Sequence, residues 1–269
     1  RIGVGFGGPL DAEQGTITKS HQVQGWDGFP LQEWCQQQLG LPTLLGNDCD
    51  VATLAEASLG AGKEFRAVFY VTVGTGVGGG YVVDGKSPLQ GRPAAAEIGH
   101  LRPGPLATSV NETVESQASG WGIVAATRRY FQQHGTDTNL DSVDAVERIL
   151  ETEADRADLL SRCGSQLDLL TARHVAEAAR DGNPLAATIL SGAIRVLGWG
   201  IAQMITLQAP EIVIVGGGVS LIGEEGFFKP LRECVAQYVF PPLRGTYQVV
   251  PAALGELAVV QGAIIRASQ

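Results

Sequence analysis

Three apolar runs each lead directly into a cluster of glycines, and this repeated pattern constrains the fold more than any other feature of the sequence. The clusters are GFGG at 5–8, GTGVGGG at 74–80 and GGG at 216–218. Glycine tolerates positive φ and lets main-chain N–H groups approach a ligand closely, which is how loops bind phosphate oxygens. One such turn would be weak evidence, because most glycine-rich turns are only tight hairpins.

The middle cluster is the most informative of the three. Its pattern alone leaves open a simple hairpin, although Thr72 and Thr75 beside it add hydroxyl donors. Gly74, Gly76 and Gly79 meet the dinucleotide-binding pattern GxGxxG, but the strand-like YVV follows where that motif requires a helix. We therefore reject the dinucleotide-binding interpretation.

Strand and helix signals alternate along the chain, which indicates an α/β architecture. Strands are predicted at 2–6, 42–48, 67–73, 81–83, 211–216 and 247–252. Helices are predicted at 30–40, 51–62, 115–135 and 257–267, with two more beginning at Thr171 and at Pro184 after Asn183. The charged region 136–168 is predicted to be helical on weaker patterning.

Composition excludes several classes of protein. Lysine and arginine total 19 against 28 acidic residues, a net charge of −9, so the chain repels nucleic acid and anionic membranes. The four cysteines are far apart and form no CxxC pair, which argues against a disulfide framework and favours a reducing cytoplasm. The apolar window 185–207 carries Arg195 at its centre, so we expect a buried helix of a soluble protein and no membrane span.

Asn47 and Asp48 follow a predicted strand and precede a predicted helix. Their side chains should therefore lie at the carboxyl edge of a sheet, where open α/β folds bind their ligands. The alternative is that Asp48 or Asp50 merely caps the helix, which is a common role for aspartate.

Glu97 and His100 lie three residues apart in AAAEIGH, and Glu115 opens the next predicted helix. Glu97 and His100 could simply form hydrogen bonds with main-chain groups near a turn. Glu115 is likewise explained as an acid that complements the helix dipole. Spacing alone does not decide between these structural roles and a binding site.

Taken together, these segments resemble the ROK family of sugar kinases and sugar-responsive repressors, which have the actin-like ATPase (ribonuclease H-like) fold. The resemblance is carried, in order along the chain, by GVGFGGPLD, GWDGFPL, GNDCDVATLAEASLGAG, VTVGTGVGGGYVVDGK, AEIGH, ESQASG, LTARHVAEAARDGNPLA and IVIVGGGVS. It implies two α/β domains with the active cleft between them. We place the smaller domain at 1–66 plus 254–269 and the larger at 67–253.

The resemblance also implies roles for the candidate residues. The sugar would be bound by Gly8, Asn47, Asp48, Glu97, His100 and Glu115, with Asp48 as the general base. ATP would be held by Gly74, Thr75, Gly76, Gly216, Gly217 and Gly218, with Mg²⁺ as its companion ion. The expected enzyme is a cytoplasmic ATP-dependent hexokinase or glucokinase acting on a hexose or an N-acetylhexosamine, and a homodimer or higher homo-oligomer.

The sequence departs from the family pattern at three places. The CxCGxxGC cluster that binds zinc after EIGH is missing from 101–115, so we expect no structural zinc. The family's first phosphate loop, Asp-x-Gly-Gly-Thr, has no counterpart, and because the sequence opens at Arg1 we expect a natural chain that is longer at this end. The family's NDxN becomes NDCD, with Asp50 in place of asparagine.

Two rival functions follow from these departures. A sugar-sensing repressor would need a basic helix-turn-helix extension, which fits poorly with the acidic charge. A catalytically silent sugar-binding protein is suggested by the missing phosphate loop. The sequence does not identify the sugar.

Overall fold

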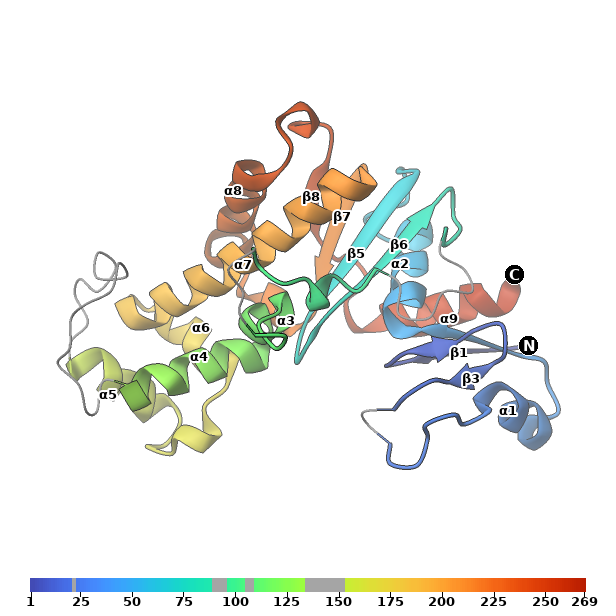
Figure 1. Ribbon diagram of the computed structural model, residues 1–269, viewed down its shortest axis with the longest axis horizontal. Coiled ribbons are helices and arrows are strands. Elements are labelled where there is room, and N and C mark those ends of the chain that lie inside the picture. The colour runs from blue at the N-terminus through green and yellow to red at the C-terminus, as the bar shows by residue number, and fades with distance from the viewer. Residues whose placement is uncertain (21–22, 89–95, 105–108, 134–152) are drawn as a thin grey trace.

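The computed structural model describes residues 1–20, 23–88, 96–104, 109–133 and 153–269. A central sheet lies between a helical region that contains α4 (Gly120–Gln133), α5 (Glu153–Arg162) and α6 (Ala172–Arg180) and a smaller region that contains β1 (Ile2–Phe6), β3 (Thr16–Ile17) and α1 (Leu31–Leu39) (Figure 1). The strand order in this sheet is β6-β5-β7-β8, with β6 antiparallel to β5 and the other neighbours parallel. Its strands are β5 (Ala67–Val73), β6 (Val77–Val83), β7 (Ile212–Gly216) and β8 (Gln248–Pro251).

The two central strands, β5 and β7, are rich in β-branched residues and are almost entirely buried. Such continuous apolar runs are typical of strands that are covered on both faces. The strands predicted at 67–73 and 211–216 are thus confirmed. The returning strand begins at Val77 and not at residue 81, so the glycines at 78–80 are strand residues and only 74–76 form the turn.

Five helices contribute buried side chains to the larger core on one face of the sheet, and α5 adds Leu159. The five helices are α3 (Val114–Ala118), α4 (Gly120–Gln133), α6 (Ala172–Arg180), α7 (Pro184–Gln208) and α8 (Lys229–Tyr238). As predicted, Thr171 caps α6, and α7 begins at Pro184 with Asn183 as its cap. By length and composition α7 could span a membrane, but 56% of its most apolar window is buried inside the protein. A buried core helix meets the same criteria of length and composition, so these criteria alone are weak evidence for a membrane span.

The single helix predicted over 115–135 is wrong in one respect. The helix is interrupted at Ser119, whose backbone is extended with ψ of 167°. The Ser119 hydroxyl accepts a hydrogen bond from the N–H of Gly122 at 3.1 Å. Ser119 therefore ends α3 and supports the start of α4. The end expected at Gly135 lies outside the described residues.

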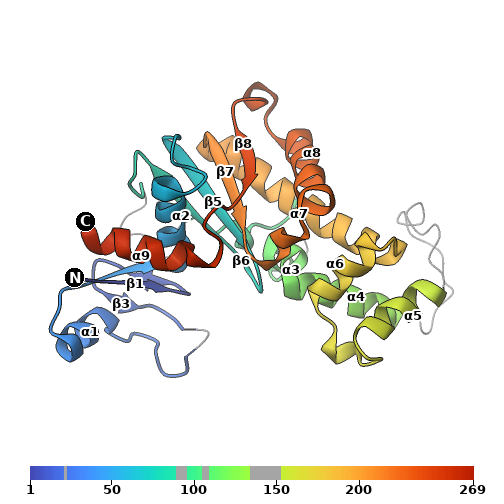
Figure 2. The same cartoon turned by 180° about the vertical axis from the view of Figure 1, so that it is seen from behind.

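Helices α2 (Asp48–Leu59) and α9 (Ala258–Ser268) pack on the other face of the sheet and against each other (Figure 2). They approach so closely that a Cβ added to Gly262 would lie 1.7 Å from the carbonyl oxygen of Val51. The fully buried carboxylate of Glu56 accepts hydrogen bonds from the N–H groups of Ala61 and Leu254, both at 2.9 Å. It therefore ties the end of α2 to the segment before α9.

The N-terminal region has its own small core under a two-stranded parallel sheet. Its elements are β1 (Ile2–Phe6), the hairpin strands β2 (Leu10–Asp11) and β3 (Thr16–Ile17), α1 (Leu31–Leu39) and β4 (Thr43–Asn47). Gly40 ends α1 in the left-handed conformation, as the sequence indicates. Both α2 and α9 contact this sheet as well as the central one, so the domain division at 66 and 254 remains a prediction.

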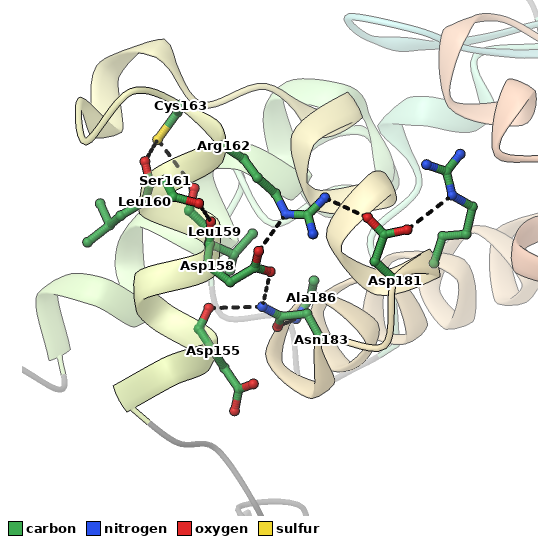
Figure 3. A network of polar contacts seen from close by, with 11 residues as sticks. Asp155, Asp158, Leu159, Leu160, Ser161, Arg162, Cys163, Asp181, Asn183 and Ala186 are labelled. Carbon is green, nitrogen blue, oxygen red and sulfur yellow. Dashed lines mark hydrogen bonds and ion pairs between the residues drawn. The ribbon is translucent and has the colours of Figure 1, made fainter.

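Helix α5 (Glu153–Arg162) confirms the helical prediction for 153–162, but the chain leaves this helix at Cys163, and 136–152 lies outside the described residues. A polar network joins α5 to α6 and α7 (Figure 3). Arg162 pairs with Asp158 and Asp181, both at 2.9 Å. Asn183, the cap of α7, donates to the Asp158 carboxylate at 2.8 Å and to the Asp155 carbonyl at 2.9 Å.

Candidate active site

The start of α2 is held by Asn47, the last residue of β4. Its Oδ1 accepts hydrogen bonds from the N–H groups of Cys49 at 2.8 Å and Asp50 at 3.4 Å. Its Nδ2 donates to the carbonyl of Gly8 at 3.1 Å. The alternative that Asp48 or Asp50 caps this helix is therefore wrong, because Asn47 caps it.

Asp48 is the first residue of α2 and is half-buried at the carboxyl end of β4. Its Oδ1 accepts a hydrogen bond from the Cys49 N–H at 2.8 Å. Burial raises the pKa of Asp48, and the hydrogen bond from Cys49 opposes that rise. A carboxylate in this setting is a stronger base than one in water.

Asp50 carries the most perturbed carboxyl group in this region. Burial, followed by the negative charges of Glu97 and Asp48, raises its pKa to about 6, and the positive charge of Arg266 opposes the rise. Arg266 comes from α9, at the far end of the chain. The last helix therefore contributes to the electrostatics around Asp50.

Glu97 lies directly before the short 3-10 helix η1 (Ile98–His100) and is half-buried, whereas His100 is exposed. Burial raises the pKa of Glu97 most. The positive charge of His100 opposes this rise, and the carboxylates of Asp48 and Glu115 add to it. The structure thus places Asp48, His100 and Glu115 each within electrostatic reach of Glu97. The preceding residue, Ala96, has a φ of 59°, a conformation that is strained for alanine.

Glu115 does more than complement the dipole of α3. Its Oε2 accepts a hydrogen bond from the N–H of Val77 at 2.9 Å, directly after the glycine turn. On the other side of the turn, the N–H of Gly120 donates to the carbonyl of Gly74 at 2.8 Å. The α3–α4 junction therefore holds both ends of the turn.

The second and third glycine turns lie side by side. Strands β5 and β7 are parallel with Thr72 opposite Gly216, so both turns leave the same edge of the sheet. Gly217 has a φ of 87°, and a Cβ added there would lie 2.6 Å from the main chain of Val73. Only glycine fits this contact.

Both turns also offer open space. A Cβ added to Gly74 or Gly218 would meet no atom within 4 Å. Within the described part of the chain, the N–H groups of Thr75 and Gly76 have no hydrogen-bond acceptor. Two free amides beside an open glycine can donate to an anion such as phosphate.

Comparison with known proteins identifies the family. The model of the ROK family matches residues 1–269. The chain belongs to the ROK family. It is 31% identical to the glucokinase of Thermotoga maritima over 263 residues, which cover 97% of this chain and 77% of that protein.

Two solved ROK structures confirm the actin-like ATPase fold. The ROK family glucokinase from Streptomyces griseus, in complex with glucose and AMPPNP, matches with a TM-score of 0.77 and 31% identity, covering 97% of this chain and 79% of that one. The ROK hexokinase from Thermus thermophilus matches with a TM-score of 0.75 and 28% identity, covering 98% of this chain and 77% of that one. These relatives confirm the sugar kinase branch of the ROK family, which the sequence motifs indicated.

Several residues that shape this ROK site could not be found by sequence reasoning. Cys49 and Thr53 pack against the glycines of β6, and Arg266 faces Asp50. Nothing in the sequence around Arg266, in the last turn of α9, indicates that it lies near Asp50. The two glycines at alternate positions, Gly78 and Gly80, are the one signal that was available, because such spacing leaves one face of a strand without side chains.

No group of three or more His, Cys, Asp or Glu side chains that could hold a metal ion occurs among the residues that the structure describes. Residues 105–108, within the segment where other ROK proteins carry their zinc cluster, lie outside that part. The expectation of a zinc-free ROK protein therefore stays a prediction.

Mg²⁺ is a different case, because it is bound in such sites by one or two carboxylates together with substrate phosphates and water. The carboxylate of Asp50 is of this donor type.

Proposed function

We propose that this ROK chain is an ATP-dependent sugar kinase that transfers the γ-phosphoryl group of ATP to a hydroxyl of a hexose, glucose-like or N-acetylated, with Asp48 as the general base. The observation that carries the proposal is the position of Asp48. Its half-buried carboxylate lies at the start of α2, within electrostatic reach of Glu97. The glucokinase relatives support the same reaction class.

Sugar binding is assigned to the polar groups around Asp48. Glu97 and Glu115 can accept hydrogen bonds from ring hydroxyls, and His100 can donate to them or accept from them. The Asn47 amide can donate through its second Nδ2–H, because its oxygen already accepts two hydrogen bonds. Gly8 contributes through its carbonyl, which fixes the Asn47 amide at 3.1 Å. A sugar hydroxyl is both donor and acceptor, so carboxylates and an imidazole together satisfy it.

Asp48 then acts on the attacking hydroxyl. Its carboxylate takes the hydroxyl proton as the sugar oxygen bonds to the γ-phosphorus and the bond to the β–γ bridging oxygen breaks, releasing ADP. General-base catalysis of this kind contributes about 10²- to 10⁴-fold. Burial of Asp48 raises its pKa, and a higher pKa makes the carboxylate a better proton acceptor.

The phosphates of ATP are assigned to Gly74, Thr75 and Gly76, whose turn offers free N–H groups. The adenosine part is assigned to the turn of Gly216, Gly217 and Gly218, which leaves the same sheet edge. Asp50 would hold Mg²⁺, which when bound with ATP neutralises charge on the transferring phosphoryl group.

Purified protein with ATP, Mg²⁺ and a panel of hexoses in a coupled ADP assay tests this function. We expect sugar-dependent ADP release with glucose or a close relative. Sugar binding by calorimetry without ADP release from any sugar would instead indicate a silent binding protein. Sugar-dependent release of a DNA operator by a full-length protein would indicate a repressor.

The remaining assignments follow from the proposed reaction. The partners are small molecules, a sugar and ATP, and neither nucleic acid nor a membrane takes part. The cytoplasm is the proposed location because ATP and free hexoses meet there. A homodimer or higher homo-oligomer is proposed from the family resemblance, and light scattering of the purified protein checks it.

A further inference from the structure

The first turn of α2 lies directly on β6, at the glycines that follow the phosphate turn. Gly78 and Gly80 point to the same face of the strand, because side chains alternate in direction. A Cβ added to Gly78 would lie 2.6 Å from Cys49 Sγ. A Cβ added to Gly80 would lie 2.2 Å from Thr53 Oγ1 and 2.6 Å from the carbonyl oxygen of Cys49. No real Cβ makes contacts this short without movement of a neighbour.

Cys49 is the residue that both glycines contact, and it is directly linked to the proposed base. Its N–H donates to Asp48 Oδ1 and to Asn47 Oδ1, both at 2.8 Å. Its side chain is buried, with 8% of its surface exposed. Its carbonyl accepts a hydrogen bond from the Thr53 hydroxyl at 2.6 Å, which stiffens this turn. A displacement of Cys49 therefore moves the group that orients the Asp48 carboxylate.

We propose that Gly78 and Gly80 are positioning residues for Asp48: by leaving one face of β6 bare, they set the depth at which the first turn of α2 lies and thereby the place of the carboxylate. The inference rests on the proposed role of Asp48. It gives the second half of the GTGVGGG segment a task distinct from the phosphate contacts assigned to Gly74, Thr75 and Gly76.

The two contacts differ in a way that makes the proposal testable. Gly78 faces a side-chain atom of Cys49, and that atom can be removed by mutation. Gly80 faces the Thr53 hydroxyl and also the main chain of Cys49, and the main-chain contact cannot be removed by mutation. Misplacing a catalytic group by about 1 Å can cost about 10²-fold in rate. We expect Gly78→Ala to lower kcat about tenfold or more, with the KM for sugar changed less than about threefold.

Rescue distinguishes positioning from general damage. Cys49→Ala in the Gly78→Ala background should restore kcat to within about threefold of Cys49→Ala alone, because the colliding sulfur is gone. The same change should not restore Gly80→Ala. Gly198→Ala is the matched control, since a Cβ there would lie 2.6 Å from Cys234 Cβ at the α7–α8 contact. It should lower the thermal midpoint while leaving kcat unchanged well below that midpoint.

Crystal structures provide a readout that does not depend on activity. In Gly80→Ala we expect the Cys49 N to Asp48 Oδ1 distance to exceed hydrogen-bond range. An unchanged distance, a wild-type kcat in Gly78→Ala and Gly80→Ala, or a failed rescue would each overturn the positioning role. Failure of the proposed function would be seen differently. An inactive wild type or an active Asp48→Asn variant would refute the kinase mechanism. The Cys49 N to Asp48 Oδ1 distance would still test whether Gly78 and Gly80 position Asp48.

Discussion

The carboxylate of Glu115 accepts a 2.9 Å hydrogen bond from the main-chain N–H of Val77, so one side chain joins α3 to the first residue after the glycine turn. The same carboxylate lies within electrostatic reach of Glu97. Glu115 therefore lies between the proposed sugar site and the proposed phosphate turn. A substitution of Glu115 should therefore affect the binding of both sugar and ATP.

Glu115→Ala should raise the KM for sugar and the KM for ATP, each by about tenfold, because a hydrogen bond from each site to a charged group is lost. Glu115→Gln keeps an oxygen that can accept from Val77, so it should raise mainly the KM for sugar. Initial-rate kinetics with each substrate varied in turn checks this. An unchanged KM for ATP in the alanine variant would show that the turn does not need Glu115.

His100→Ala should raise the KM for sugar more than the KM for ATP, because the exposed imidazole lies beside Glu97 on the proposed sugar side. His174→Ala is a suitable control, since that histidine belongs to the capping box of α6. The reverse pattern, with the larger effect on ATP, would place His100 at the nucleotide.

Asp50→Asn, which restores the family pattern, should stabilise the protein without ligands at about pH 8. Burial raises the pKa of Asp50 from 3.8 to about 6, so the folded state binds this proton more tightly than the unfolded state. The ionised carboxylate therefore costs stability above about pH 6, and this cost vanishes below about pH 4.

Removing that cost should add about 2–3 kcal/mol to the free energy of unfolding at about pH 8 and little at about pH 4. Urea unfolding of the wild type and the variant at both pH values measures the difference. A gain of equal size at the two pH values would mean that the charge of Asp50 is not the source.

Asn183→Ala should cost about 2–3 kcal/mol of stability, because Asn183 is buried and both caps α7 and donates to Asp158 and the Asp155 carbonyl. Asn183→Ser keeps a capping oxygen but not the two donated bonds, so its loss should be smaller. Thermal unfolding measures both. Equal losses would show that the cap contributes nothing and that the two donated bonds carry the whole effect, and kcat should not change in either variant.

Much of this architecture is predictable because the signals are local. The runs that form β5 and β7 are rich in β-branched residues, and Asn183 with Pro184 marks the start of α7. The order of the motifs along the chain predicts the ROK family, which the comparisons confirm. The position of Asn47 and Asp48 at the carboxyl end of a strand was also predictable, because a helix signal follows them directly.

The parts that could not be predicted depend on contacts between distant segments. Gly80 lies in a strand and not in the turn, and its bare face lies against Cys49 and Thr53 of α2. Helix α3 ends at Ser119, although the local sequence reads as one continuous helix. Arg266 approaches Asp50 only because α9 crosses α2 at Gly262. Periodicity carries no information about such packing.

The central claim is that Asp48 removes the proton of the attacking hydroxyl, and one measurement tests it most directly. Asp48→Asn keeps the shape of the side chain but cannot take a proton. Single-turnover kinetics should show the chemical step slowed by about 10²- to 10⁴-fold, while calorimetry shows sugar affinity changed less than about threefold. Near-normal turnover in Asp48→Asn would contradict the account.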